Sequence, residues 1–161
     1  MREILFRGQH RRYGEKVLVG TGERLPGRWV YGGVLQGTGD FSVIYGAESP
    51  DFRGSELAKW PVYTDTLGQY TGLNDKNGKR IFEGDKLLPF DDDIDKMVVE
   101  FDHGQFLVCI YGDRGYRSES GDWEYDGSNY GIIECEPLSS YGDDIMVIGN
   151  IHDNPELLKG G

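Results

Sequence analysis

Residues 97–111, MVVEFDHGQFLVCIY, contain two runs of β-branched and aromatic residues on either side of the pair His103-Gly104. Two such runs joined by a two-residue loop are typical of a β-hairpin. The loop sets three apolar pairs opposite one another: Phe101 and Phe106, Val99 and Val108, and Met97 and Ile110. Because opposite residues share one face of a sheet, we predict that this face belongs to the core. A slip of one residue would set Glu100 against Phe106, which favours the register chosen.

The rest of the chain also reads as short strands separated by glycine-dependent turns. Glycine supplies 25 of the 161 residues, and it tolerates the positive φ that tight turns require. The segment 74–78, NDKNG, predicts a second hairpin turn with its glycine near the left-handed region. Further strand-like runs are found at 16–20, 28–35, 41–45, 67–72, 80–82, 85–88, 130–135 and 145–151. The sequence therefore predicts an all-β protein, an antiparallel barrel or sandwich.

The length fits one compact domain, which we expect to span residues 1–161. A subdivision into N-terminal strands at 1–65 and a barrel core at 66–158 is the alternative. No apolar run reaches the ~18 residues of a membrane span, and the charged start does not resemble a signal peptide. We therefore expect a soluble, cytoplasmic protein.

Charge is unevenly distributed along the chain. The net charge is −11 overall, with about +2 in residues 1–90 and about −13 in residues 91–161. The negative half repels phosphate, so nucleic-acid binding there is not expected. A basic excess in the first 30 residues fits contact with a phosphate, with an acidic patch of the same chain or with a second copy.

Two local features complete the expected fold. Asn154 followed by Pro155 and Glu156 is typical of a helix start and predicts one short C-terminal helical turn. Cys109 and Cys135 lie in apolar runs without a metal-ligand spacing, so we predict two reduced core thiols.

No motif in the sequence indicates catalysis. The acidic run Asp91, Asp92, Asp93 and Asp95 lacks the glycine and the final glutamate of a calcium loop, so it predicts a solvated loop. The pair Glu83 and Asp85 around Gly84 predicts a turn anchor rather than an acid-base pair. We therefore expect no enzyme activity, no cofactor and no metal.

Aromatic residues gather in the acidic half of the chain among Gly, Ser and Asp. They are Trp123, Tyr125, Tyr130, Tyr116 and Tyr141. Exposed Tyr and Trp residues are typical of a protein-binding face. Ordinary packing at strand edges is the alternative.

Five stretches, in order, resemble the YopX family of temperate-phage and prophage proteins. They are EILFRG at 3–8, WVYGG at 29–33, TLGQYTGLNDKNGKRIFEGDKL at 66–87, VVEFDHGQF at 98–106 and VIGNIHDNPELL at 147–158. The resemblance implies an all-β fold with SH3-like barrel character. It implies no activity, cofactor or catalytic residue.

Within these motifs, Ile81, Phe82, Val147 and Ile148 read as core residues. The polar and aromatic members that packing explains least are Gln69, Tyr70, His152, Asp153 and Asn154. We single these out, together with Trp123 and Tyr125, as a candidate partner or ligand surface.

The leading hypothesis is a non-enzymatic phage accessory protein that binds a protein partner, with homo-oligomerisation as a further option. The first alternative is an acidic mimic of nucleic acid that occupies a host DNA-binding protein. A further alternative is nucleic-acid binding through the basic N-terminal segment, which the pI of about 4.6 disfavours.

Overall fold

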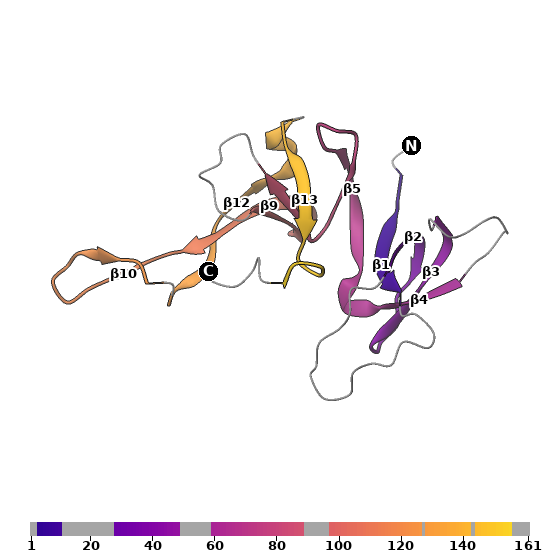
Figure 1. The fold of residues 1–161 in the computed structure, drawn as a ribbon, viewed down its shortest axis with the longest axis horizontal. Helices are drawn as coiled ribbons and strands as arrows, with labels where there is room; N and C mark the ends of the chain where they lie inside the picture. The colour runs from indigo at the N-terminus through magenta and orange to yellow at the C-terminus, as the bar shows by residue number, and fades with distance from the viewer. Residues whose placement is uncertain are drawn as a thin grey trace. The chain divides into compact units, whose positions relative to one another are not determined.

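The computed structural model describes residues 3–10, 28–48, 59–88, 97–126, 128–142 and 144–155. Among these residues, the strands are antiparallel and the only helical elements are short 3-10 turns, which confirms the all-β prediction. The chain divides into two compact units, unit 1 at Met1–Gly72 and unit 2 at Leu73–Gly161 (Figure 1). This boundary lies seven residues beyond the 65/66 subdivision considered from sequence.

Unit 1 is a small sheet whose pairings close on themselves. Its elements are β1 (Phe6–His10), β2 (Arg28–Leu35), β3 (Phe41–Glu48), β4 (Lys59–Tyr63), the 3-10 turn η1 (Thr64–Thr66) and β5 (Gly68–Asn74), whose end enters unit 2. The strands pair in the cycle β1, β2, β3, β4 and back to β1. On the same edge of β1, His10 pairs with β4, whereas Phe6 and Arg7 pair with β5. β1 therefore connects β5 to the rest of the sheet.

The core of unit 1 forms around Val30, Ile44 and Val62, all nearly inaccessible to solvent. Arg7 is also buried, with its guanidinium 4.5 Å from the centre of the Trp29 ring. Of the basic N-terminal residues, Arg7 therefore makes an intramolecular contact. Arg2, Arg11, Arg12, Lys16 and Arg24 lie outside the described residues.

Unit 2 is built on a five-stranded sheet. Its elements are β6 (Arg80–Phe82), β7 (Asp85–Leu88), β8 (Met97–Asp102), β9 (Gln105–Asp113), β10 (Tyr116–Arg117), β11 (Trp123–Glu124), β12 (Tyr130–Pro137), the 3-10 turn η2 (Leu138–Tyr141) and β13 (Met146–Asn150). The sheet order is β12-β9-β8-β7-β13, and β10 and β11 pair separately. Thus β12 and β13 form the edges of the five-stranded sheet.

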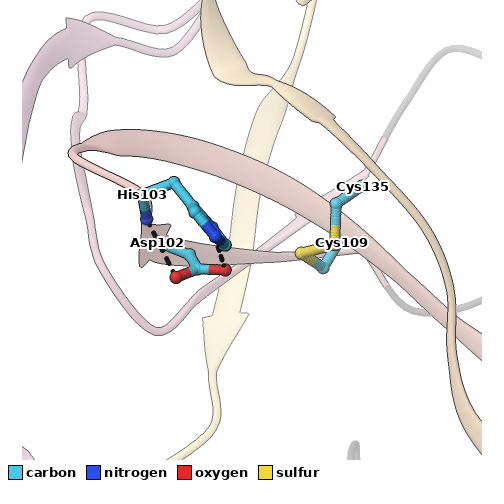
Figure 2. A network of polar contacts seen from close by, with 4 residues as sticks. All are labelled: Asp102, His103, Cys109 and Cys135. Carbon is cyan, nitrogen blue, oxygen red and sulfur yellow. Dashed lines mark hydrogen bonds and ion pairs between the residues drawn. A yellow bond between two sulfur atoms is a disulfide. The ribbon is translucent and has the colours of Figure 1, made fainter.

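The predicted β8–β9 hairpin is confirmed residue by residue, including all three apolar pairs. His103 has φ 49° and Gly104 has φ 79°, the positive values of the hairpin turn that matches strand twist. His103 lies at this tip, 2.8 Å from the Asp102 carboxylate (Figure 2). Met97, Val99 and Val108 are in the core of unit 2, whereas Phe101, next to the tip, is exposed.

The remaining core residues of unit 2 come from segments far apart in sequence. They are Ile81, Leu87, Leu138, Ile145 and Val147. The expectation that Ile148 also belongs to the core is wrong, because its side chain is 43% exposed. The register of β13 against β7 shifts between Val147 and Gly149, and such a bulge changes which side a residue faces.

The turn predicted at residues 74–78 is confirmed, and the buried carboxylate of Asp75 organises it. Gly78 has φ 80°. Asp75 Oδ1 accepts hydrogen bonds from the amides of Asn77 at 2.8 Å and Lys79 at 2.9 Å. Asp75 Oδ2 accepts from the amide of Val147 at 3.0 Å, so this one side chain links the turn to β13.

The prediction of two reduced thiols is wrong, because Cys109 and Cys135 form a disulfide (Figure 2). The two residues are 26 positions apart but directly opposite in the β9–β12 ladder, with Cα atoms 4.1 Å apart. Directly opposite residues of this kind bring their side chains within bridging reach. Spacing alone did not reveal this pairing.

Two sequence-based predictions fall wholly or partly outside the described residues. Pro155 has 3-10 conformation, but the rest of the predicted C-terminal turn, including Glu156, lies outside the described residues. The acidic run Asp91–Asp95 also lies outside them. Among the residues that are described, no group of His, Cys, Asp and Glu could hold a metal ion.

The first prediction concerns Asp75. Its burial alone would raise the pKa of the carboxyl group, but the backbone hydrogen bonds from Val147, Lys79 and Asn77 outweigh this and lower it below 3.8. A lowered pKa contributes stability that is complete above pH 3.8 and lost as the pH falls through the folded-state value. D75N, which sets an amide donor against a backbone donor, should lose about 1–3 kcal/mol of unfolding free energy at pH 7. Urea unfolding of the wild type and D75N between pH 7 and pH 2 should show the difference between their unfolding free energies becoming smaller in acid. A difference that stays constant with pH would contradict the prediction.

The second prediction concerns the disulfide. It closes a loop with a sequence separation of 26, for which loop-closure entropy gives about 3 kcal/mol of stabilisation. Reduction of the wild type, or the double substitution C109S/C135S, should therefore lower the unfolding free energy by about that amount. Denaturant unfolding with and without dithiothreitol measures it. The double variant is the control, since its midpoint should not respond to the reductant.

Candidate functional site

The feature of unit 2 that its core does not explain is a β-hairpin between β9 and β12, which we call the arm (residues 114–126). Its strands are β10 and β11, with Tyr116 opposite Glu124 and Arg117 opposite Trp123. Figure 1 shows the β10 hairpin extending away from the five-stranded sheet of its unit. None of the hydrophobic residues of the arm belongs to a described core cluster.

Hydrogen bonds order the tip of the arm. The Ser118 amide donates to the Asp122 carbonyl at 2.9 Å, and the Gly121 amide donates to the Ser118 carbonyl at 2.9 Å. The Ser118 hydroxyl lies 2.8 Å from that of Ser120, which donates to the Asp122 carboxylate at 3.0 Å. An isolated two-stranded ribbon is only marginally stable, so these bonds hold the arm in one shape.

The base of the arm is fixed in the same way. The Gly115 amide donates to Asp113 Oδ1 at 2.9 Å. The Asn129 side chain donates to the Gly115 carbonyl at 2.7 Å, and the Arg114 amide donates to the Asn129 carbonyl at 3.2 Å. The arm is therefore anchored to the ends of both strands that carry it.

One face of the arm presents two large aromatic side chains to solvent. Trp123 is 60% exposed and Tyr125 is 67% exposed, and alternate residues of a strand share a face. The Tyr125 ring lies against Gly115, where an added Cβ would be 2.7 Å from Tyr125 Cε1. Only glycine leaves room for the ring there. Arg117, opposite Trp123, lies on the same face.

The other face and the tip are acidic. The Tyr116 hydroxyl donates to Glu124 Oε2 at 2.8 Å, and this hydrogen bond is the main cause that raises the pKa of Tyr116. Hydrogen bonds from Ser128 lower the pKa of Asp126. The exposed carboxylates of the arm are Glu119, Asp122, Glu124 and Asp126.

A second candidate site forms where two sequence motifs meet. The turn at Gly84 connects β6 and β7, and Asp85 Oδ2 accepts from the Phe82 amide at 2.8 Å, as expected for a turn anchor. The Ile151 amide donates to the Gly84 carbonyl at 3.0 Å, so the segment after β13 crosses this turn. An added Cβ at Gly84 would lie 3.5 Å from His152 Nε2.

Buried Asn150 organises that C-terminal segment, the Asn150 loop (residues 150–154). Asn150 Oδ1 accepts from the amides of His152 at 3.0 Å and Asp153 at 2.9 Å. Asn150 Nδ2 donates to Asp153 Oδ2 at 2.8 Å. The Asn154 amide donates to the Asn150 carbonyl at 3.0 Å, and its side-chain oxygen lies over Gly149. The polar groups of this loop thus bond extensively to one another.

The sequence-predicted surface residues therefore fall into three groups. Trp123 and Tyr125 lie together on the arm, and His152, Asp153 and Asn154 lie together in the Asn150 loop. Gln69 and Tyr70 belong to β5 in unit 1, where Gln69 pairs with Phe6 and Tyr70 is 7% exposed.

One polar contact, on the sheet face opposite Met97 and Val99, was not predicted from the sequence. The Tyr111 hydroxyl of β9 hydrogen bonds to the Glu100 carboxylate of β8. Burial and this hydrogen bond raise the pKa of Tyr111 well above its ordinary value. The alternation of both strands placed the two residues on one face, but they are four pairs apart in register, so alternation did not predict the contact.

Among the residues that the structure describes, no helix is long and apolar enough to cross a membrane. The two antiparallel units define a small all-β protein.

The comparisons with known proteins then give the family. Residues 46–159 match the family described as YopX protein, so the chain belongs to the YopX family, as its motifs predicted. The crystal structure of protein EF1440 from Enterococcus faecalis is 29% identical, over 74% of this chain and 76% of that one, with a TM-score of 0.35. No curated protein matches the sequence.

A substitution pair tests the hydrogen bonds of the Asn150 loop. N150D keeps the side-chain oxygen that accepts from the amides of His152 and Asp153. It loses the donor to Asp153 and sets two carboxylates together, so it should cost about 1–3 kcal/mol of stability. The reciprocal variant N150D/D153N restores a donor and an acceptor and should recover most of the loss. Denaturant unfolding at pH 7 measures both. If the double variant is no more stable than N150D, the Asn150–Asp153 bond is not the organising contact.

Proposed function

We propose that this protein is a non-enzymatic accessory protein of temperate phages that binds a protein partner through the aromatic face of the arm, in the bacterial cytoplasm. The observation that carries the proposal is the exposure of Trp123 and Tyr125, two residues apart on an ordered hairpin. The phage context rests on the family.

Two physical arguments favour a protein partner. Leaving an indole and a phenol ring in water forgoes the stabilisation that burial of such large apolar surfaces provides. Because hydrogen bonds at the tip and the base already order the arm, docking would cost little further conformational entropy. Exposed Trp and Tyr residues on a rigid support are the type of residue that dominates binding energy at interfaces.

The charges of the arm specify the complementary surface. The arm that presents the aromatic pair also carries the exposed carboxylates of Glu119, Asp122 and Glu124, so the partner should offer an apolar pocket with basic residues at its rim. Exposed rim charges act mainly on association rate and salt dependence. The complex should therefore weaken moderately with salt but persist when the aromatic contacts are intact.

Nucleic-acid mimicry is the second candidate function, favoured by the exposed carboxylates of the arm. Mimicry differs from binding through the aromatic face in the interaction that provides most of the binding energy. A mimic depends on its carboxylates and should lose its target steeply as salt rises, as phosphate-binding proteins do. Binding that depends on Trp123 and Tyr125 and survives high salt favours the aromatic face instead.

The test is capture of a partner from host lysate on immobilised protein, at about 0.05 M and about 0.5 M salt. We expect a specific partner that W123A/Y125A loses, with at least about tenfold weaker retention, because truncated hot-spot residues typically cost more than 1 kcal/mol each.

The matched control is L35A, since Leu35 of unit 1 is also 60% exposed but is remote from the arm in sequence. E119Q/E124Q tests the carboxylates separately. Retention that survives W123A/Y125A and fails with E119Q/E124Q at low salt would support mimicry. A column that retains nothing above background would contradict both functions.

A further inference from the structure

The strand that leaves the arm, β12, contributes no buried side chain to unit 2. Tyr130 and Gly131 are half-buried, and residues 132–137 are exposed. Ile133, at 54%, is among the exposed large hydrophobic residues. Since burial of apolar groups is what holds most strands in place, β12 depends on its ladder with β9 and on the disulfide.

The disulfide lies at a position where it controls the arm. β9 enters the arm and β12 leaves it, and Cys109 and Cys135 join these two strands (Figure 2). Between the disulfide and the arm, the ladder is irregular, with a register shift between Ile132 and Glu134. A ladder with a bulge and no buried face on one strand specifies its register weakly. The covalent link at Cys135 supplies the missing constraint.

The two sulfur-bearing residues differ in access. Cys109 is 1% exposed and belongs to the interior of the sheet, whereas Cys135 is an exposed residue of the edge strand. They are the only cysteines in the sequence, so no other thiol of the chain competes for either. An external thiolate approaches from the side of Cys135.

We propose that Cys109–Cys135 is a reversible redox clasp, which holds β12 and the arm in the register that presents Trp123 and Tyr125. This regulation rests on the proposed binding function of the arm. A cytoplasmic setting favours reversibility, because disulfides there are mostly transient or redox-sensing.

The chemistry is thiol–disulfide exchange with a dithiol as reductant. One thiolate of the dithiol attacks Cys135 Sγ, the bond between the two cysteine sulfurs breaks, and Cys109 leaves as a thiolate that takes up a proton. The second thiol of the dithiol, as its thiolate, attacks the sulfur bonded to Cys135, which leaves as the second thiolate and is protonated. The protein gains two electrons and two protons, and the dithiol is oxidised to a disulfide.

Hydrogen–deuterium exchange of the full chain, oxidised and after dithiothreitol, tests the clasp without a partner. Alkylation and mass measurement establish the thiol count in each sample. We expect amides of β12 and the arm to exchange about tenfold faster or more after reduction, under conditions in which unit 2 stays folded, while unit 1 changes little. Removal of the reductant and addition of oxidised glutathione should restore slow exchange. C109S/C135S should exchange like the reduced protein under both conditions.

Unchanged exchange on reduction, or failure to re-form the disulfide, would overturn the clasp. The same two samples are then used for capture from host lysate. Loss of the partner from the reduced protein supports control of the arm, and equal capture by both overturns that control. If neither sample retains a partner while exchange responds to reduction, the proposed function fails and the redox-dependent ordering of the arm stands.

Discussion

The register of β8 against β9 is the constraint on which unit 2 depends. The tight turn at His103 and Gly104 fixes it, and it places Met97, Val99 and Val108 on one face. Every other core segment of the unit packs against that face. On the opposite edge of β9, a separate register against β12 pairs Cys109 with Cys135. The core of unit 2 thus follows from one two-residue loop, and the base of the arm from the β9–β12 ladder.

Two buried carboxylates connect segments of unit 2 that are far apart in sequence or that turn sharply. Asp75 joins its turn to β13 through the Val147 amide, and Asp85 closes the next turn through the Phe82 amide. Both bonds satisfy backbone donors in the interior, where an unsatisfied group costs about 1–3 kcal/mol. They thereby connect the turns at 74–78 and 83–84 to the sheet.

Sequence alone could predict the features that depend on local chemistry. The β8–β9 hairpin and the turn at Asp75 follow from residues within a few positions of each other, and both are confirmed. Features that depend on distant pairing could not be read in this way. The disulfide requires the register of β12, which a bulge shifts, and Ile148 is exposed because a second bulge lies beside it.

For the candidate site, the sequence identified Trp123 and Tyr125 by composition, but not the reason for their exposure. That reason is the place of the arm outside the five-stranded sheet: β10 and β11 pair with each other, and the hydrophobic residues of the arm belong to neither described core cluster. Glycine at 115 leaves room for the Tyr125 ring, and the hydrogen bonds of the tip replace the missing core as the source of order. A segment stabilised by polar turns rather than by burial keeps its apolar groups available for another surface. The disulfide has a comparable role for β12, because a strand without buried side chains can be held or released by a single covalent bond.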